Sequence, residues 1–274
     1  MTEIDIKDIK KLTETIQSRY DFDFSNYALS SFKRRIKRIM DLQNIKSVDS
    51  LISKIETNAL YFKEFLSEIT VNVTEMFRDP TFWIALRENV LLPYFKNNNE
   101  IRIWHAGCSS GEEVYSMAIL LDSIGMLSHA KLYASDIDEK ILDQAKNKTY
   151  SKKNMEINTS NFNKLYPEID LLKYFEENDD LFTISEKLTK NVTFKKHNLV
   201  SDPAFSKFDI VLCRNVLIYF NQQLQNNVLN KLTSGLFKGG TLCIGSKESL
   251  IWCESINQFK EINKEEKIFK KITD

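Results

Sequence analysis

The sequence lacks the paired or clustered residues that form disulfides and metal sites. Its four cysteines are widely spaced and include no Cys-x-x-Cys pair, and its three histidines are scattered. Disulfide frameworks and zinc sites both need such residues at short, regular spacings. We therefore expect reduced thiols and no metal ion.

Long apolar runs and an excess of one charge are absent as well. No apolar stretch approaches the length that crosses a bilayer, and Met1–Lys10 lacks the apolar core of a secretory signal. With 38 basic and 38 acidic residues, the chain has no overall field that would favour nucleic acid or an anionic membrane. We expect a cytoplasmic monomer that binds no nucleic acid and does not insert into a membrane.

Glycine and proline are missing from roughly the first seventy residues, where apolar residues recur every three or four positions. This periodicity predicts three or four amphipathic helices and a helical domain over residues 1–75. The apolar positions are Ile6, Ile9, Leu12 and Ile16; Phe32, Ile36, Ile39 and Met40; Leu51, Ile52 and Ile55; and Leu60, Phe62, Phe65, Leu66 and Ile69.

From Glu100 onward, short apolar segments alternate with segments of helix length, which predicts an α/β domain with a parallel sheet within residues 76–274. The expected strands are 101–105, 131–135, 192–196, 208–213 and 240–245, the expected helices are 112–124, 138–146 and 222–236, and the tail from 259 to 272 predicts an antiparallel pair. The long polar stretch from Thr149 to Lys190 does not fit, and we interpret it as an insertion, a small β unit near residues 150–190.

A glycine-containing turn, Gly107–Gly111, follows the first expected strand and leads into a helix that begins with Glu112 and Glu113. The turn has neither the G-x-G-x-x-G pattern nor the lysine of a P-loop, which argues against dinucleotides and nucleoside triphosphates. The two carboxylates would repel a pyrophosphate but could hold the ammonium group of S-adenosylmethionine, which carries no phosphate. On the turn alone, an equally good interpretation is that they only favour the positive end of the helix dipole.

The second expected strand ends at Asp136, 25 positions after Gly111, close to the ~20 at which α/β nucleotide folds place a ribose-binding carboxylate. Asp138 is better placed to cap the next helix. Asn198 and Leu199 follow the third strand and could hold an adenine by one polar and one apolar contact. Ligand-binding loops of open parallel sheets gather at such strand ends.

Four motifs in this order resemble the CheR family of chemotaxis receptor methyltransferases. They are Thr70–Pro80 (TVNVTEMFRDP), Gly107–Glu113 (GCSSGEE), Ala134–Asp138 (ASDID) and Cys213–Phe220 (CRNVLIYF). The resemblance implies a helical domain before a Rossmann-like methyltransferase domain with a small β subdomain. It also implies conversion of receptor glutamates to methyl esters, with S-adenosylmethionine as cofactor and S-adenosylhomocysteine as product.

The resemblance further implies a set of site residues. The cofactor contacts are Asn72, Thr74, Arg78, Glu113, Asp136, Asn198, Leu199, Arg214 and Asn215. Arg78 and Tyr219 flank the site of methyl transfer as catalytic residues. Without the resemblance, an ion pair of Arg78 with Asp79 or Glu75 and a core position for Tyr219 would be the first interpretations.

The chain departs from the family pattern in three places. Val114 stands where a proline often follows the paired glutamates, and the segment Gly245–Ser249 lacks a frequent histidine; we expect neither departure to touch a residue assigned to the cofactor. A glycine-containing loop that binds the receptor's C-terminal pentapeptide in some relatives is missing between Phe175 and Leu181. We therefore expect docking on chemoreceptor helices through the N-terminal domain.

The segment from Phe32 to Met40 carries five basic residues around an apolar stripe. Such a run is often only a solvated helix face, but a basic face would also attract a receptor helix that bears glutamates. Alternative functions remain open: a non-catalytic S-adenosylmethionine-binding signalling protein, or a methyltransferase of another protein or of RNA. Against the RNA alternative, the chain has no Asn/Asp-Pro-Pro-aromatic loop after the fourth strand.

Overall fold

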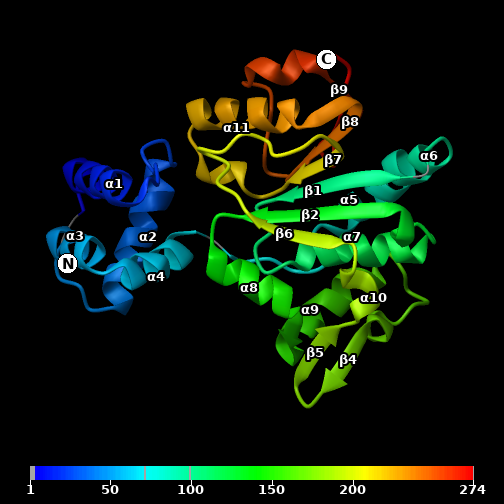
Figure 1. The fold of residues 1–274 in the computed structure, drawn as a ribbon, viewed down its shortest axis with the longest axis horizontal. Coiled ribbons are helices and arrows are strands. Elements are labelled where there is room, and N and C mark those ends of the chain that lie inside the picture. Colours follow the sequence, from blue (N-terminus) through cyan, green and yellow to red (C-terminus); the bar gives the residue numbers. More distant parts are fainter. Residues whose placement is uncertain (1–3, 71, 99, 274) are drawn as a thin grey trace.

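We describe residues 4–70, 72–98 and 100–273 of a computed structural model of the chain. The first of these parts is a helical bundle of α1 (Ile6–Tyr20), α2 (Leu29–Leu42), α3 (Val48–Thr57) and α4 (Ala59–Ile69), at the left of Figure 1. Side-chain caps from Asp5 and Asn58 fix the starts of α1 and α4 by accepting backbone N–H groups. The predicted apolar stripes form the bundle's core, except that Ile6 and Leu60, in the first turns of α1 and α4, are 69% and 67% exposed.

The remainder is organised around one sheet in the order β6-β2-β1-β7-β8-β10-β9. Its strands are β1 (Ile101–Ala106), β2 (Ala130–Asp136), β6 (Val192–Lys196), β7 (Phe208–Cys213), β8 (Leu236–Ile244), β9 (Phe259–Asn263) and β10 (Ile268–Lys271). The first five run parallel, and β10 is antiparallel to both β8 and β9, which confirms the predicted parallel sheet and antiparallel tail. The strand order reverses between β1 and β7, so their carboxyl ends border a crevice.

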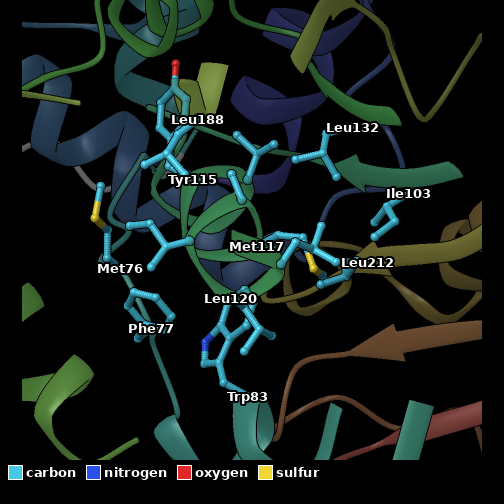
Figure 2. Close-up of a cluster of buried hydrophobic side chains, with 14 of the residues drawn as sticks. Met76, Phe77, Trp83, Ile103, Tyr115, Met117, Leu120, Leu132, Leu188 and Leu212 are labelled. Atoms are coloured by element: carbon cyan, nitrogen blue, oxygen red, sulfur yellow. The ribbon is translucent and has the colours of Figure 1, made fainter. Parts of the chain in front are cut away.

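Helices cover both faces of the sheet (Figure 1). They are α5 (Pro80–Leu86), the π-helical segment η1 (Arg87–Leu91), α6 (Leu92–Phe95), α7 (Glu112–Ser123), α8 (Glu139–Asn147) and α11 (Gln222–Ser234), with short 3-10 turns η2 (Leu127–His129), η4 (Leu217–Tyr219) and η5 (Glu254–Gln258). Side chains alternate along β1, so Ile103 joins the core under α7 and Trp104 joins the core under α11. Figure 2 shows Met76 and Phe77 lying against the first of these cores.

Strand β8 begins at Leu236, earlier than the predicted start at Gly240. The register with β7 shifts between Phe208 and Ile210, and Gly239 has a φ of 81°. A glycine in the left-handed region interrupts the alternation of apolar and polar residues on which the prediction depends. The irregularity therefore hid the first part of the strand.

The insertion forms a separate antiparallel sheet, β3 (Thr149–Ser151), β5 (Leu181–Ile184) and β4 (Phe175–Asn178), at the bottom of Figure 1. This confirms a small β unit, but helices accompany it: α9 (Lys152–Asn163), the 3-10 turn η3 (Leu171–Tyr174) and α10 (Glu186–Thr189). Helix α9 escaped prediction because two of its four buried residues, Asn158 and Asn161, are polar. Within the described ranges, no helix has the length and apolar character needed to cross a membrane.

Candidate functional site

A pocket of about 1060 Å³, its open mouth included, lies at the carboxyl ends of β1 and β7 and under the N-terminal domain. Every residue assigned to the cofactor or to catalysis from the sequence lines it: Asn72, Thr74, Arg78, Glu113, Asp136, Asn198, Leu199, Arg214, Asn215 and Tyr219. The structure thus brings together residues from far-apart motifs, while their individual roles stay predictions.

The turn after β1 uses its backbone donors internally. The N–H groups of Gly107 and Cys108 donate to Ser135 O at 2.8 and 2.9 Å, and that of Ser109 donates to Asp136 Oδ2 at 2.9 Å. A phosphate site needs such N–H groups free and pointing at the ligand. The turn therefore fits a nucleoside without a phosphate.

Close approach of two loops requires glycine at position 107. Gly107 has a φ of 77°, and a Cβ there would lie 2.6 Å from Val216 Cγ2, in the segment after β7. Any larger residue would push apart the two loops that floor the pocket. Nearby, the buried Ser109 hydroxyl has no hydrogen-bond partner within the described residues and lines the same pocket. The closely packed loops and the unpartnered Ser109 hydroxyl together suit the binding of a nucleoside.

Glu113 lies at the centre of a buried charge network. Its Oε1 accepts from His105 Nδ1 at 2.9 Å, and its Oε2 accepts from Arg214 at 3.2 Å, while Arg214 also donates to Asp79 at 2.8 Å. Burial raises the pKa of Glu113, but the His105 and Arg214 interactions outweigh burial and leave this pKa below its ordinary value. Glu113 is therefore an anion at neutral pH, as binding of an ammonium group requires.

Glu112 does not line the pocket. It is buried at the start of α7, where the Ser110 hydroxyl donates to its Oε2 at 2.7 Å. Burial raises its pKa, and the hydrogen bond from Ser110 only partly opposes that shift. Of the two glutamates, then, only Glu113 is placed to meet a ligand, and Glu112 fits the interpretation as a helix-start residue.

Asp138 caps the helix after β2 as predicted, and Asp136 lines the pocket, where its contact with a ribose stays a prediction. Burial raises the pKa of Asp136 against hydrogen bonds from the Ser109 and Asp138 N–H groups. Asp138 instead caps α8 by accepting from the Lys140 N–H at 3.0 Å. A carboxylate has about four lone-pair sites, and the backbone N–H groups of Ser109, Ile137 and Asp138 donate to Asp136, so acceptor capacity remains for a ribose hydroxyl.

The loop after β6 is held rigid from within and from α11. Asn198 Oδ1 accepts from the Val200 N–H at 2.9 Å, and Lys231 donates to Leu199 O at 3.2 Å. The side-chain nitrogen of Asn198, Nδ2, has no partner among the described residues and remains available as a donor. Together with the apolar Leu199 side chain, this arrangement suits an adenine.

Arg78 is not paired as the alternative interpretation supposed. Among the described residues its hydrogen bond is to Val73 O at 3.4 Å, and Asp79 pairs with Arg214 instead. The Arg78 guanidinium thus lines the pocket without a carboxylate of its own. An unpaired, partly buried arginine is suited to receive an anionic group.

The segment that carries Arg78 is held in a strained backbone conformation. Phe77 and Asp79 have φ values of 52° and 55°, a region that side chains with a Cβ seldom adopt. Asn158 and Asn161 of α9 bind both backbone groups of Met76, at 2.9 and 3.1 Å. Strained residues of this kind gather at functional sites, where surrounding contacts hold them.

Tyr219 lies beneath the N-terminal domain, where Arg35 is stacked over its ring at 4.4 Å. Arg35 therefore turns inward from α2 and lines the pocket, whereas Arg34, Lys37 and Arg38 are exposed. The predicted basic face consequently loses one of its five members to the pocket.

The expectation that the segment 245–249 stays clear of the cofactor residues is wrong. The buried Glu248 carboxylate accepts from the N–H groups of Asn215, Gly245 and Ile218 at 3.1, 2.6 and 3.3 Å. It thereby fixes the backbone of Asn215, whose φ is 62°. Burial raises the pKa of Glu248, and these three donors oppose the shift.

Sequence reasoning also missed Tyr27, Arg35 and His105 as parts of the site. Tyr27 and Arg35 line the pocket from the N-terminal domain, and His105 supports Glu113 from within β1. The sequence did carry a signal for His105, a histidine in an otherwise apolar strand eight residues before Glu113. No local pattern marks Tyr27 or Arg35 as a pocket residue.

A Rossmann-like sheet with a phosphate-free nucleoside pocket at its switch point defines the class of S-adenosylmethionine-dependent methyltransferases. Residues 72–268 match the family model described as the SAM binding domain of CheR methyltransferase, and residues 7–70 match the all-alpha domain of CheR methyltransferase. The chain belongs to the CheR methyltransferase family, and its cofactor is S-adenosylmethionine.

Relatives match over most of their length. A Pseudomonas putida protein with the provisional name of methyltransferase Cher3 is 38% identical over 264 residues, 96% of each chain. Chemotaxis protein methyltransferases of Listeria monocytogenes and Borreliella burgdorferi are 30% and 31% identical, over 89% of this chain and 91% and 88% of theirs. Magnesium protoporphyrin IX methyltransferase from Synechocystis, solved with bound SAH, is 18% identical with a TM-score of 0.34, over 71% of this chain and 70% of that one.

Proposed function

We propose that this chain is a cytoplasmic enzyme that methylates glutamate side chains on the cytoplasmic helices of chemoreceptors, giving glutamyl methyl esters and S-adenosylhomocysteine. Family membership and the names of the relatives support a chemotaxis methyltransferase. The observation that carries the acceptor's chemistry is Arg78, which lines the cofactor pocket without a carboxylate partner within the described residues. A carboxylate acceptor would supply that partner.

When bound, S-adenosylmethionine supplies a methyl carbon on a sulfonium, from which a carboxylate oxygen displaces the thioether. A glutamate with a reference pKa near ~4.3 is ionised at neutral pH, so the enzyme needs no general base. Arg78 orients the carboxylate by charge-assisted hydrogen bonds, and Tyr219 positions it. Alignment of the two reactants and exclusion of water can lower the barrier to methyl transfer by roughly 7–11 kcal/mol at best.

The exposed face of α2 is suited to dock the acceptor helix. Arg34, Lys37 and Arg38 are exposed, and among the described residues none of them has an ion-pair partner. Their apolar neighbours on the helix are buried, so the helix presents a cationic surface to solvent. An acidic helix would be attracted to this surface and guided toward Arg78.

Reversing two charges on this face tests the docking role. We expect R34E together with R38E to raise the KM for receptor roughly three- to ten-fold at low salt, because long-range attraction becomes repulsion. The effect should shrink above about 0.15 M salt, where screening shortens the reach of exposed charges to about 8 Å. Steady-state kinetics at several salt concentrations give the measurement.

A matched control reverses Lys260 and Lys264, which are exposed on the C-terminal hairpin. K260E with K264E makes the same change in net charge and should leave the KM unchanged. Equal rises in the two double variants would mean that net charge, rather than the α2 face, controls the encounter.

The reaction itself is tested with radiolabelled S-adenosylmethionine and chemoreceptor membranes. We expect label on the receptor that base releases as methanol, since methyl esters hydrolyse under conditions that leave N-methyl groups intact. Receptor whose candidate glutamates are replaced by alanine is the control and should stay unlabelled. Base-stable label on another protein or on RNA, or binding of cofactor without any transfer, would replace the proposal by one of its alternatives.

A further inference from the structure

A short segment of the N-terminal domain is joined to the segment that carries Tyr219. Asn26–Ala28 runs antiparallel to Tyr219–Asn221, with main-chain hydrogen bonds of 2.8 and 2.9 Å and a side-chain hydrogen bond of 2.9 Å between the two asparagines. Strand-like pairing of this kind fixes both backbones relative to each other. The N-terminal domain is thereby attached to one wall of the cofactor pocket.

Tyr27 is the central residue of this junction. Its ring packs edge-on against Phe220, with centroids 5.2 Å apart, and against Phe24 at 4.9 Å. It also lines the cofactor pocket, as Asp136 does from the opposite domain. The ring is therefore held in one orientation by aromatic neighbours from both sides of the junction.

The Tyr27 hydroxyl is the unusual feature. None of the described residues hydrogen-bonds it, although the side chain is partly buried. Burial, followed by the negative charge of Asp136, raises the pKa of the phenol above its usual value, so it stays a neutral donor. A phenol hydroxyl that lines the pocket and has no protein partner is available to donate a hydrogen bond to a bound ligand.

We propose that Tyr27 is a cofactor-binding residue, whose hydroxyl hydrogen-bonds a ribose hydroxyl of S-adenosylmethionine on the side of the pocket formed by Asp136. The nucleoside would then be held by both domains, through Asp136 and Tyr27. Because the paired segment also carries Tyr219, occupation of the pocket strengthens the attachment that positions Tyr219. This inference depends on the cofactor alone and not on the identity of the methyl acceptor.

The test compares two tyrosine variants by calorimetric titration with S-adenosylhomocysteine. Y27F keeps the aromatic packing and removes the hydroxyl, and it should raise the Kd about three- to ten-fold, the usual effect of losing one neutral hydrogen bond. Y20F is the matched control, because Tyr20 is in the same domain and its hydroxyl donates to Ile55 O at 2.6 Å, outside the pocket. Its Kd should equal that of the wild type.

A ligand lacking both ribose hydroxyls distinguishes a direct contact from a general loosening of the junction. Wild type and Y27F should bind this analogue equally, because the bond lost in the variant is already absent. Hydrogen exchange gives a second readout, since S-adenosylhomocysteine should protect residues 22–32 more in the wild type than in Y27F. An unchanged Kd in Y27F, or an equal loss on both ligands, would overturn the assignment, whereas absent receptor labelling would bear only on the proposed function.

Discussion

Replacing Arg78 by alanine is expected to lower kcat roughly 100-fold or more with saturating receptor, because misplacement of a reacting group by about 1 Å can cost that much. The Kd for S-adenosylhomocysteine should rise less than about ten-fold, since the main partner of Arg78 is proposed to be the acceptor. The melting temperature should change little, because within the described residues its side chain makes one long hydrogen bond, to Val73 O at 3.4 Å. Turnover and calorimetry on the same preparation give the three values.

Arg87 offers a matched control for this substitution. It is also partly buried, but it pairs with Glu88 at 3.0 Å and lies over the Tyr166 ring, away from the pocket. R87A should keep wild-type kcat. R78K retains the charge but not the bidentate geometry of a guanidinium, so its kcat should lie between those of R78A and the wild type. Wild-type turnover in R78A would remove Arg78 from the mechanism.

The fold was largely predictable because its elements carry strong periodic signals. The apolar stripe of α2 is buried as predicted, and β6 and β7 have the predicted bounds, 192–196 and 208–213. Helix α9 carries a weaker signal, since it buries Asn158 and Asn161 to hold Met76 rather than to form an apolar core. Polar residues buried for a structural purpose look exposed in a sequence.

Apart from Asn72, Thr74 and Arg78, which the family resemblance supplied, the pocket residues were predictable where they lie on the ligand-binding loops of the sheet. Asp136 and Glu113 follow strand ends, where the topology of parallel sheets predicts ligand contacts. Tyr27 enters the pocket because two segments almost 200 residues apart pair through their backbones at one isolated bridge, which is too short to leave a strand pattern in the sequence. The inward turn of Arg35 likewise depends on the packing of α2 against the ring of Tyr219.

The two glutamates at the start of α7 should differ in how the same substitution affects ligand binding. We expect E113Q to raise the Kd for S-adenosylhomocysteine about 10- to 100-fold, because the ammonium group loses an ionised acceptor. It should also destabilise the fold by about 1–3 kcal/mol, since His105 and Arg214 lose a charged partner. E112Q should bind the ligand as the wild type does, because Glu112 is buried away from the pocket.

The pH dependence of unfolding separates the two carboxylates further. The pKa of Glu113 is lower in the folded than in the unfolded protein, where it is about 4.3. Ionised Glu113 therefore stabilises the fold at pH values above about 4.3, and this stabilisation is lost as the pH falls through the folded pKa. The raised pKa of Glu112 has the opposite sign, so ionised Glu112 costs stability as the pH rises through its folded value. At pH 7, E113Q should therefore be less stable than the wild type and E112Q as stable or more so, with both differences shrinking toward acid in urea titrations. If E112Q weakened ligand binding as much as E113Q does, the assignment of the ammonium site to Glu113 alone would be wrong.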